Sequence, residues 1–219
     1  MDLKDNYKAI AFDFDGTLVE SIEMKTEAFK KLFSEYPDSW DEIKEYHLQN
    51  EGISREVKVP YIYKNFLRAP LSVEKEKEMV ESYSDLVYEQ MLYIPLVSGA
   101  DEIITAERGS RKHFIASGTP DWELKQIFDK RDLTRFFDGV YGAPSSKEEI
   151  VRNFSSEWGI PMEEMLFVGD AQSDYEASRV CGMDFVWRKR PYDAKEIKSD
   201  GQDIITVKDM TELSEMLRR

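Results

Sequence analysis

Short apolar runs, each followed by turn residues, recur along this chain of 219 residues and limit the folds open to it. The runs lie at 8–15, 112–118, 138–144, 164–170, 184–189 and, as a weaker candidate, 204–207. Helical patterns follow four of them, at 120–129, 146–157, 172–180 and 208–218. Strands that alternate with helices pair in parallel and are covered by helices on both faces. The chain is therefore expected to have an α/β fold built on a parallel sheet.

One long stretch interrupts this alternation, because almost a hundred residues without an obvious strand separate the first two runs. Its apolar residues fit two helix faces instead, Ile22, Phe29, Leu32, Phe33 and Tyr36 on one and Met79, Val80, Tyr83, Leu86, Val87 and Met91 on the other. We predict a helical bundle at 20–92, inserted into a core of 1–19 and 93–219. A helix at 99–108 leads back to the sheet, and the EKEKE segment at 74–78 is expected to be a solvated helix start.

Composition excludes several classes of partner. The net charge of −14 argues against a nucleic acid, whose phosphates need a basic face. No apolar run reaches the roughly 18 residues of a membrane span, and the polar start is unlike a signal peptide. We therefore expect a cytoplasmic protein without a membrane partner, monomeric by default. The single cysteine, Cys181, is expected to be buried, and the basic run at 188–190 to be a solvated loop.

Four short motifs each follow a predicted core strand, and such strand ends share one edge of a parallel sheet. They are DFDGT at 13–17, SGTP at 117–120, SSKEE at 145–149 and GDAQSD at 169–174. Asp13 and Asp15 lie two residues apart, where each raises the cost of ionising the other. With Asp170 and Asp174 at the same edge, the cluster is costly without a cation, and oxygen ligands favour Mg²⁺. His47 and His113 are expected to be structural, so no zinc site is predicted.

The second and third motifs suit an anion. In 117–120 a threonine at a helix N-cap and a proline at the first helical position would leave backbone N–H groups free to bind one. In 145–149 two Ser-x-x-Glu pairs have capping-box spacing, which places Lys147 in the first helical turn. A cation there opposes the helix dipole, and an anionic ligand would remove that conflict. For each motif an ordinary turn, cap or solvent-facing lysine stays open as the alternative.

Taken in order, these motifs resemble those of the haloacid dehalogenase-like hydrolase superfamily. The position of the insert resembles the alpha-helical-cap subgroup, which includes β-phosphoglucomutase and phosphoglycolate phosphatase. The resemblance implies a Rossmann-like parallel sheet core with an inserted helical-bundle cap domain. It also implies a phosphoric monoester hydrolase that acts with Mg²⁺ on a small phosphorylated metabolite through an aspartyl-phosphate.

The resemblance also implies a role for each motif residue. Asp13 is the expected nucleophile, and Asp15 is the expected general acid and base, with a pKa raised by the surrounding acids. The phosphoryl group is expected to bind Ser117, Gly118 and Lys147. The expected metal site comprises Asp13, Asp15 through its backbone carbonyl, Asp170 and, in support, Asp174.

The insert carries two further candidates. The sequence GISR at 52–55 resembles the cap loop of β-phosphoglucomutase, where the arginine grips the non-reacting phosphate. Arg55 and Lys25 are therefore expected to bind substrate. The alternative left open is a cap-surface or N-terminal helix position for Arg55 and a solvated position for Lys25. Glu51 stands where that mutase has a lysine, and Lys25 where it has a histidine, which favours a phosphatase over a phosphomutase. The acid at Asp15 argues against a dehalogenase, whereas a phosphomutase and a non-catalytic protein that binds a phosphate ligand stay open.

Overall fold

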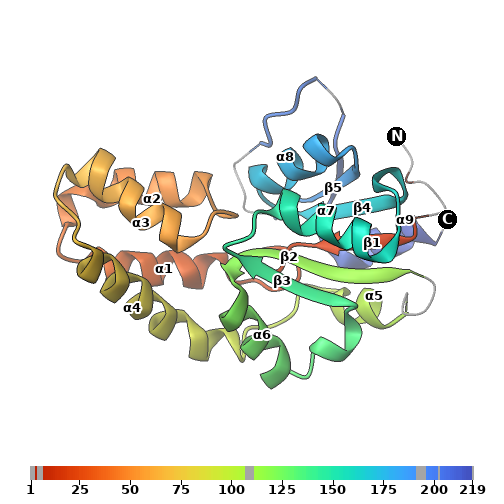
Figure 1. Cartoon of the computed structure of the whole chain (residues 1–219), viewed down its shortest axis with the longest axis horizontal. Coiled ribbons are helices and arrows are strands. Elements are labelled where there is room, and N and C mark those ends of the chain that lie inside the picture. The colour runs from red at the N-terminus through yellow and green to blue at the C-terminus, as the bar shows by residue number, and fades with distance from the viewer. Residues whose placement is uncertain (1–2, 4–6, 107–110, 191–195, 202, 219) are drawn as a thin grey trace.

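The computed structural model describes residues 3, 7–106, 111–190, 196–201 and 203–218, and its core is one parallel sheet (Figure 1). Six strands lie in the order β3-β2-β1-β4-β5-β6. They are β1 (Ala9–Phe12), β2 (Lys112–Pro120), β3 (Gly139–Ala143), β4 (Met165–Gly169), β5 (Asp184–Arg188) and β6 (Ile205–Val207). The predicted Rossmann-like α/β core is confirmed, including its weaker sixth strand. The strand order reverses beside β1, where folds of this type bind ligands.

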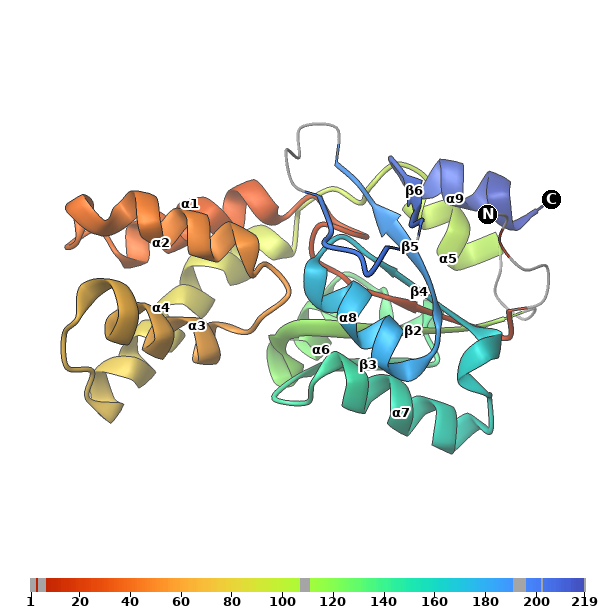
Figure 2. The ribbon, with the colours of Figure 1, turned by 90° about the horizontal axis from the view of Figure 1, so that it is seen from above.

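Helices cover both faces of the sheet, as the apolar runs require. One face packs against α5 (Ala100–Ala106), α6 (Asp121–Lys130) and α9 (Met210–Leu217), and the other against α7 (Lys147–Trp158) and α8 (Gln172–Cys181). Along β1 the side chains alternate, so Ile10 and Phe12 join the first core cluster while Ala9 and Ala11 join the second. Figure 2 shows these two layers from above. The part of the predicted helix at 107–108 lies outside the described residues.

Two helix starts decide where motif residues point. The capping box of α7 uses the second Ser-x-x-Glu pair, because Ser146 Oγ accepts the N–H of Glu149 at 3.2 Å and the Glu149 side chain accepts the N–H of Ser146. Lys147 is thus the first residue of α7. The N-cap predicted at Thr119 is wrong, because α6 starts two residues later and the Thr119 hydroxyl points elsewhere.

The inserted segment forms four α-helices on one side of the sheet, beyond the carboxyl ends of β1 and β4 (Figures 1 and 2). They are α1 (Ile22–Leu32), α2 (Trp40–Gln49), α3 (Arg55–Ile62) and α4 (Val73–Met91). Shorter helical turns occupy Pro37–Ser39, Tyr63–Leu67, Thr134–Phe136 and Met162–Glu164. The two predicted faces belong to α1 and α4, although α1 ends before Phe33. The charged start of α4 is exposed or half-buried, as predicted.

The chain passes between core and insert at two adjacent crossings. The N–H of Val97 donates to the carbonyl of Leu18, and Val19 forms an isolated bridge with Leu96. This pairing holds the two connections side by side. The inserted helical cap is part of the confirmed fold, and we keep 20–92 as its proposed limits. Among the described residues, no helix has both the length and the apolarity needed to cross a bilayer.

Candidate active site

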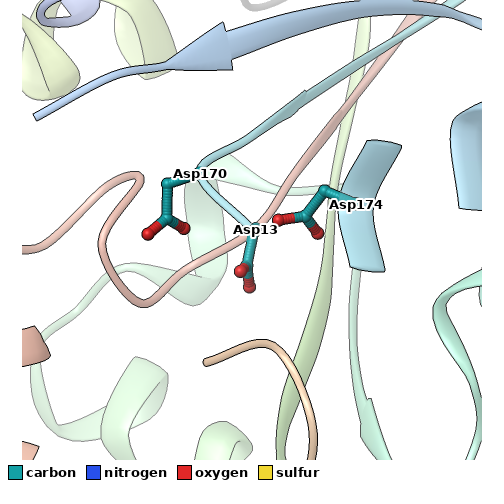
Figure 3. Close-up of side chains that lie close together, drawn as sticks. All are labelled: Asp13, Asp170 and Asp174. Atoms are coloured by element: carbon teal, nitrogen blue, oxygen red, sulfur yellow. The ribbon is translucent and has the colours of Figure 1, made fainter. Parts of the chain in front are cut away.

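The carboxylates of the first and last motifs meet beneath the cap. Asp13 follows β1, Asp170 follows β4, and Asp174 lies in the first turn of α8 (Figure 3). One carboxylate oxygen from each lies within 4.8 Å of the other two, and all three side chains are buried. The parallel register explains this meeting, because β1 and β4 pair directly from Ala9 with Met165 to Phe12 with Val168.

Lys147 lies between two of these carboxylates. Its Nζ is 2.9 Å from Asp13 Oδ2 and 2.5 Å from Asp174 Oδ1, and its side chain is buried. The alternative of a solvent-facing lysine is therefore wrong. Burial lowers the pKa of Lys147, but the two carboxylates outweigh it and leave that pKa raised. Burial in turn raises the pKa of Asp13 to about 7, with further contributions from Asp174 and Asp15, although Lys147 opposes the rise.

Asp15 lies beside this cluster in a hydrogen-bonded environment of its own. Its Oδ1 accepts the Ser21 hydroxyl at 2.6 Å, and its Oδ2 accepts the Thr119 hydroxyl at 2.8 Å and lies 2.7 Å from Lys25 Nζ. Burial raises the pKa of Asp15, but Lys25 and these hydroxyl donors outweigh it, so the pKa lies below its ordinary value. The expectation of a raised pKa was wrong, because the nearest charge is a lysine and not another acid. Lys25 is correspondingly half-buried against the core rather than solvated.

Asp170 has one carboxylate oxygen that receives no hydrogen bond from the described residues, as a metal ligand requires. Its Oδ1 accepts the Thr17 hydroxyl at 3.1 Å, whereas Oδ2 is buried and accepts no hydrogen bond from the residues that the structure describes. Burial raises the pKa of Asp170 well above its ordinary value, despite the nearby guanidinium of Arg190. Gly16 has a φ of +74°, and a Cβ there would lie 2.2 Å from Asp170 Oδ2. An oxygen that accepts no hydrogen bond from the described part of the chain, in a cluster of carboxylates, fits a hard divalent cation such as Mg²⁺.

The phosphate-binding candidates lie where the cap touches the core. Ser117 is buried, and its Oγ accepts the N–H of Thr119 at 3.1 Å. A Cβ on Gly118 would lie 2.5 Å from the carbonyl oxygen of Gly52, and a Cβ on Gly52 would lie 3.1 Å from Lys147 Nζ. The loop between α2 and α3 therefore rests directly on the second and third motifs.

A small cavity of about 40 Å³ connects the cap with the carboxylates. Asp13, Asp15, Lys25 and Arg55 all line it. Arg55 is buried, with Nη2 at 2.8 Å from Glu123 Oε2 and Nη1 donating to Ser84 Oγ at 2.6 Å. Arg55 is the first residue of α3, so its alternative of an N-terminal helix position is confirmed. The alternatives of a cap-surface Arg55 and a solvated Lys25 are wrong, and both side chains line the cavity between cap and core.

Comparison with known proteins agrees with this arrangement. The family model described as haloacid dehalogenase-like hydrolase matches residues 10–188, which include all four motifs and the insert. This chain belongs to the haloacid dehalogenase-like hydrolase family. The predicted enzyme class, a phosphoric monoester hydrolase, is confirmed.

Relatives of this haloacid dehalogenase-like hydrolase span almost its full length. A phosphoglycolate phosphatase from Aliivibrio fischeri is 25% identical over 92% of this chain and 93% of its own. A phosphorylated carbohydrates phosphatase from Thermotoga maritima is 24% identical over 82% of this chain and 84% of its own. The crystal structure of CbbY from Rhodobacter sphaeroides with xylulose-(1,5)bisphosphate superposes with a TM-score of 0.75 at 18% identity, over 94% of this chain and 96% of that one. At that identity the superposition supports the fold alone.

Sequence reasoning missed two buried arginines in this hydrolase. The run at 188–190 was predicted to be a solvated loop, yet Arg188 and Arg190 are both buried. Arg188 donates to the carbonyl of Gly16 at 2.9 Å and pairs with Glu20, while Arg190 pairs with Glu51 at 2.8 Å. Arg188 ends β5 and Arg190 lies two residues beyond it, at the edge of the sheet that carries the four motifs, and this position was the available signal.

The remaining expectations concern residues outside the carboxylate cluster, although His47 lines the small cavity beside it. Cys181 is buried, and both histidines are buried as predicted. His47 packs against the ring of Phe29 with centroids 4.2 Å apart, and burial lowers the pKa of His113 to about 4. Neither histidine belongs to the carboxylate cluster.

Proposed function

We propose that this enzyme is a Mg²⁺-dependent phosphatase that hydrolyses a small phosphorylated metabolite through an aspartyl-phosphate on Asp13. The observation that carries the proposal is the convergence of Asp13, Asp170 and Asp174, with Lys147 between Asp13 and Asp174. Asp15 is adjacent but separately hydrogen-bonded. The two curated relatives, which act on phosphoglycolate and phosphorylated carbohydrates, support a small phosphorylated substrate.

Asp13 is the proposed nucleophile. Its Oδ1 accepts the N–H of Phe14 at 2.6 Å, which fixes the orientation of the carboxylate. In the first step a carboxylate oxygen of Asp13 bonds to phosphorus, the bond from phosphorus to the ester oxygen breaks, and Asp15 gives its proton to that oxygen. In the second step Asp15 takes a proton from water, the water oxygen bonds to phosphorus, and the bond to Asp13 breaks to release phosphate.

The contact with Lys25 controls whether Asp15 carries a proton. In the structure described here, the lowered pKa keeps Asp15 ionised at neutral pH, whereas the first step needs its proton. Lys25 lies in the cavity and supplies the largest of the contributions that lower this pKa. A substrate anion that draws Lys25 away would therefore raise the pKa of Asp15 and prepare it as an acid.

The phosphoryl group and the metal share the remaining polar groups. Ser117, the backbone of Gly118 and Lys147 would bind the phosphoryl oxygens and balance the charge that develops on them. The metal would be held by three carboxylates and a backbone carbonyl, those of Asp13, Asp170, Asp174 and Asp15. Bound there, Mg²⁺ supplies positive charge to the phosphoryl oxygens and offsets the repulsion among the carboxylates.

A phosphatase fits this site better than the two alternatives. The guanidinium of Arg55 pairs with Glu123 and Ser84, so a phosphomutase would have to displace both contacts to bind a second phosphate with it. We propose that Arg55 and Lys25 contact the substrate from the cap side of the cavity that they line. A non-catalytic binding protein would be expected to lack at least one essential group, and the nucleophile, the acid and the lysine are all present.

Release of inorganic phosphate from a panel of phosphorylated metabolites tests the proposal. The panel includes phosphoglycolate and sugar phosphates, with Mg²⁺ or with chelator. We expect Mg²⁺-dependent release that Asp13→Asn abolishes. The matched control is Asp132→Asn, since the Asp132 side chain is 70% exposed and lies outside the site. Release that persists in chelator would overturn the proposed dependence on Mg²⁺. Release that persists in Asp13→Asn would overturn the assignment of Asp13 as the nucleophile.

A further inference from the structure

Arg190 joins the predicted metal site to the cap. It lies just beyond β5, and its Nη1 is 3.1 Å from Asp170 Oδ2 while its Nη2 donates to Glu51 Oε2 at 2.8 Å. Asp170 belongs to the core, whereas Glu51 belongs to the cap loop that rests on the second and third motifs. The side chains of all three are at most 5% exposed. One buried guanidinium therefore bridges two acids from different parts of the molecule.

The contact with Asp170 is a charge contact without hydrogen-bond alignment. The two atoms are 3.1 Å apart, yet Asp170 Oδ2 accepts no hydrogen bond from any residue that the structure describes. This oxygen keeps its lone pairs available while a permanent positive charge lies beside it, because a guanidinium does not lose its proton in proteins. A divalent cation at Asp170 would face that charge at close range and would have to displace it.

The contact with Glu51 closes the cap over the site. The cavity of about 40 Å³ has room for a few water molecules and not for a phosphorylated metabolite. A second cavity, of about 440 Å³, is lined by Gly52, Ser117 and Lys147. A movement of the cap loop that joins the two cavities would separate Glu51 from Arg190. Loss of this buried pair exposes both charges to solvent, so the pair resists opening for as long as Arg190 stays in place.

We propose that Arg190 is a positioning residue that occupies Asp170 in the metal-free enzyme, holds the cap closed through Glu51, and gives up Asp170 when Mg²⁺ binds. The inference rests on the proposed Mg²⁺ site at Asp170. Since binding affinities are linked reciprocally, metal binding and cap closure are coupled through this one side chain.

Isothermal titration calorimetry with Mg²⁺, without substrate, tests whether Arg190 occupies Asp170 in the metal-free enzyme. If Arg190 is on Asp170 for about nine-tenths of the time, Arg190→Gln should bind Mg²⁺ about tenfold more tightly than the wild type. Lys189→Gln is the matched control, because it removes the same charge from the neighbouring residue, which pairs with Glu196 instead. The double variant Arg190→Gln with Glu51→Gln removes both partners and should also bind tightly, which covers the case in which the single variant folds poorly.

Distances between two spin labels test whether Arg190 holds the cap closed through Glu51. Labels on Val73→Cys in the cap and Val180→Cys in the core, both strongly exposed, are combined with Cys181→Ser. Without metal, we expect a single narrow distance in the wild-type background and a broader, shifted distribution in Arg190→Gln. Glu51→Gln weakens the tether to the cap and leaves Arg190 beside Asp170, so it should broaden the distances without tightening Mg²⁺ binding.

The outcomes separate this inference from the proposed function. Wild-type protein that takes up no Mg²⁺ would overturn both. Wild-type protein that binds Mg²⁺, with Arg190→Gln binding equally or more weakly, would overturn the role of Arg190 and leave the metal site standing. Unchanged label distances in both Glu51→Gln and Arg190→Gln would overturn the closure of the cap through this pair.

Discussion

Replacement of Lys147 by methionine tests how the site is held together without metal. The helix dipole alone predicts that loss of this cation from the start of α7 stabilises the protein, by about 0.3–1 kcal/mol. The structure predicts the opposite, because Lys147 is buried between Asp13 and Asp174. Removal of one partner from a buried ion pair costs about 3–5 kcal/mol, since the remaining charges lose their compensation.

For a chain of this length, 1 kcal/mol corresponds to about 2–4 °C in melting temperature, so Lys147→Met should melt about 6–20 °C below the wild type. The assay is thermal unfolding followed by circular dichroism at neutral pH with chelator. Lys147→Met combined with Asp174→Asn should recover part of the loss, because one of the two uncompensated acids is removed. A Lys147→Met melting temperature equal to or above that of the wild type would refute the reasoning.

Two further predictions follow from pKa shifts. The pKa of His113 is lowered to about 4, so the unfolded chain binds more protons than the native protein between pH 4 and 6.5. Stability should therefore decrease as the pH is lowered from 6.5 to 4, by up to about 1.4 kcal/mol per pH unit, and His113→Phe should flatten that slope in urea unfolding. Lys25→Met removes the lysine that most lowers the pKa of Asp15, so carbon NMR should find the Asp15 carboxyl titrating at higher pH than in the wild type, and an unchanged titration would contradict the assigned pair.

The core of the site was predictable from local sequence. Asp13, Lys147 and Asp170 each follow an apolar run that reads as a buried strand, and parallel strands bring such positions to one edge. No knowledge of distant contacts is needed for that step. The cap was predictable as an inserted helical bundle because its apolar residues repeat with helical spacing.

The partners of the cap residues were not predictable in this way. Arg55 pairs with Glu123, which is 68 residues away in sequence, and Arg190 pairs with Glu51, which is 139 residues away. Periodicity assigns a residue to a face but does not say which charge from another segment will face it. The run at 188–190 looked solvated because arginine is seldom buried without a paired acid, and the acids that pair with it come from the cap and its connection to the core.

The most direct test of the central claim is to trap the phosphorylated enzyme. Asp15→Asn should slow the second step, whereas p-nitrophenyl phosphate needs no acid for its leaving group, so the intermediate should accumulate. The reaction is quenched with acid during turnover with Mg²⁺, and the peptides are measured by mass spectrometry. The account predicts one phosphoryl group on the peptide that contains Asp13, absent when Asp13→Asn is added. Turnover without a phosphorylated peptide, or with the phosphoryl group on another residue, would contradict it.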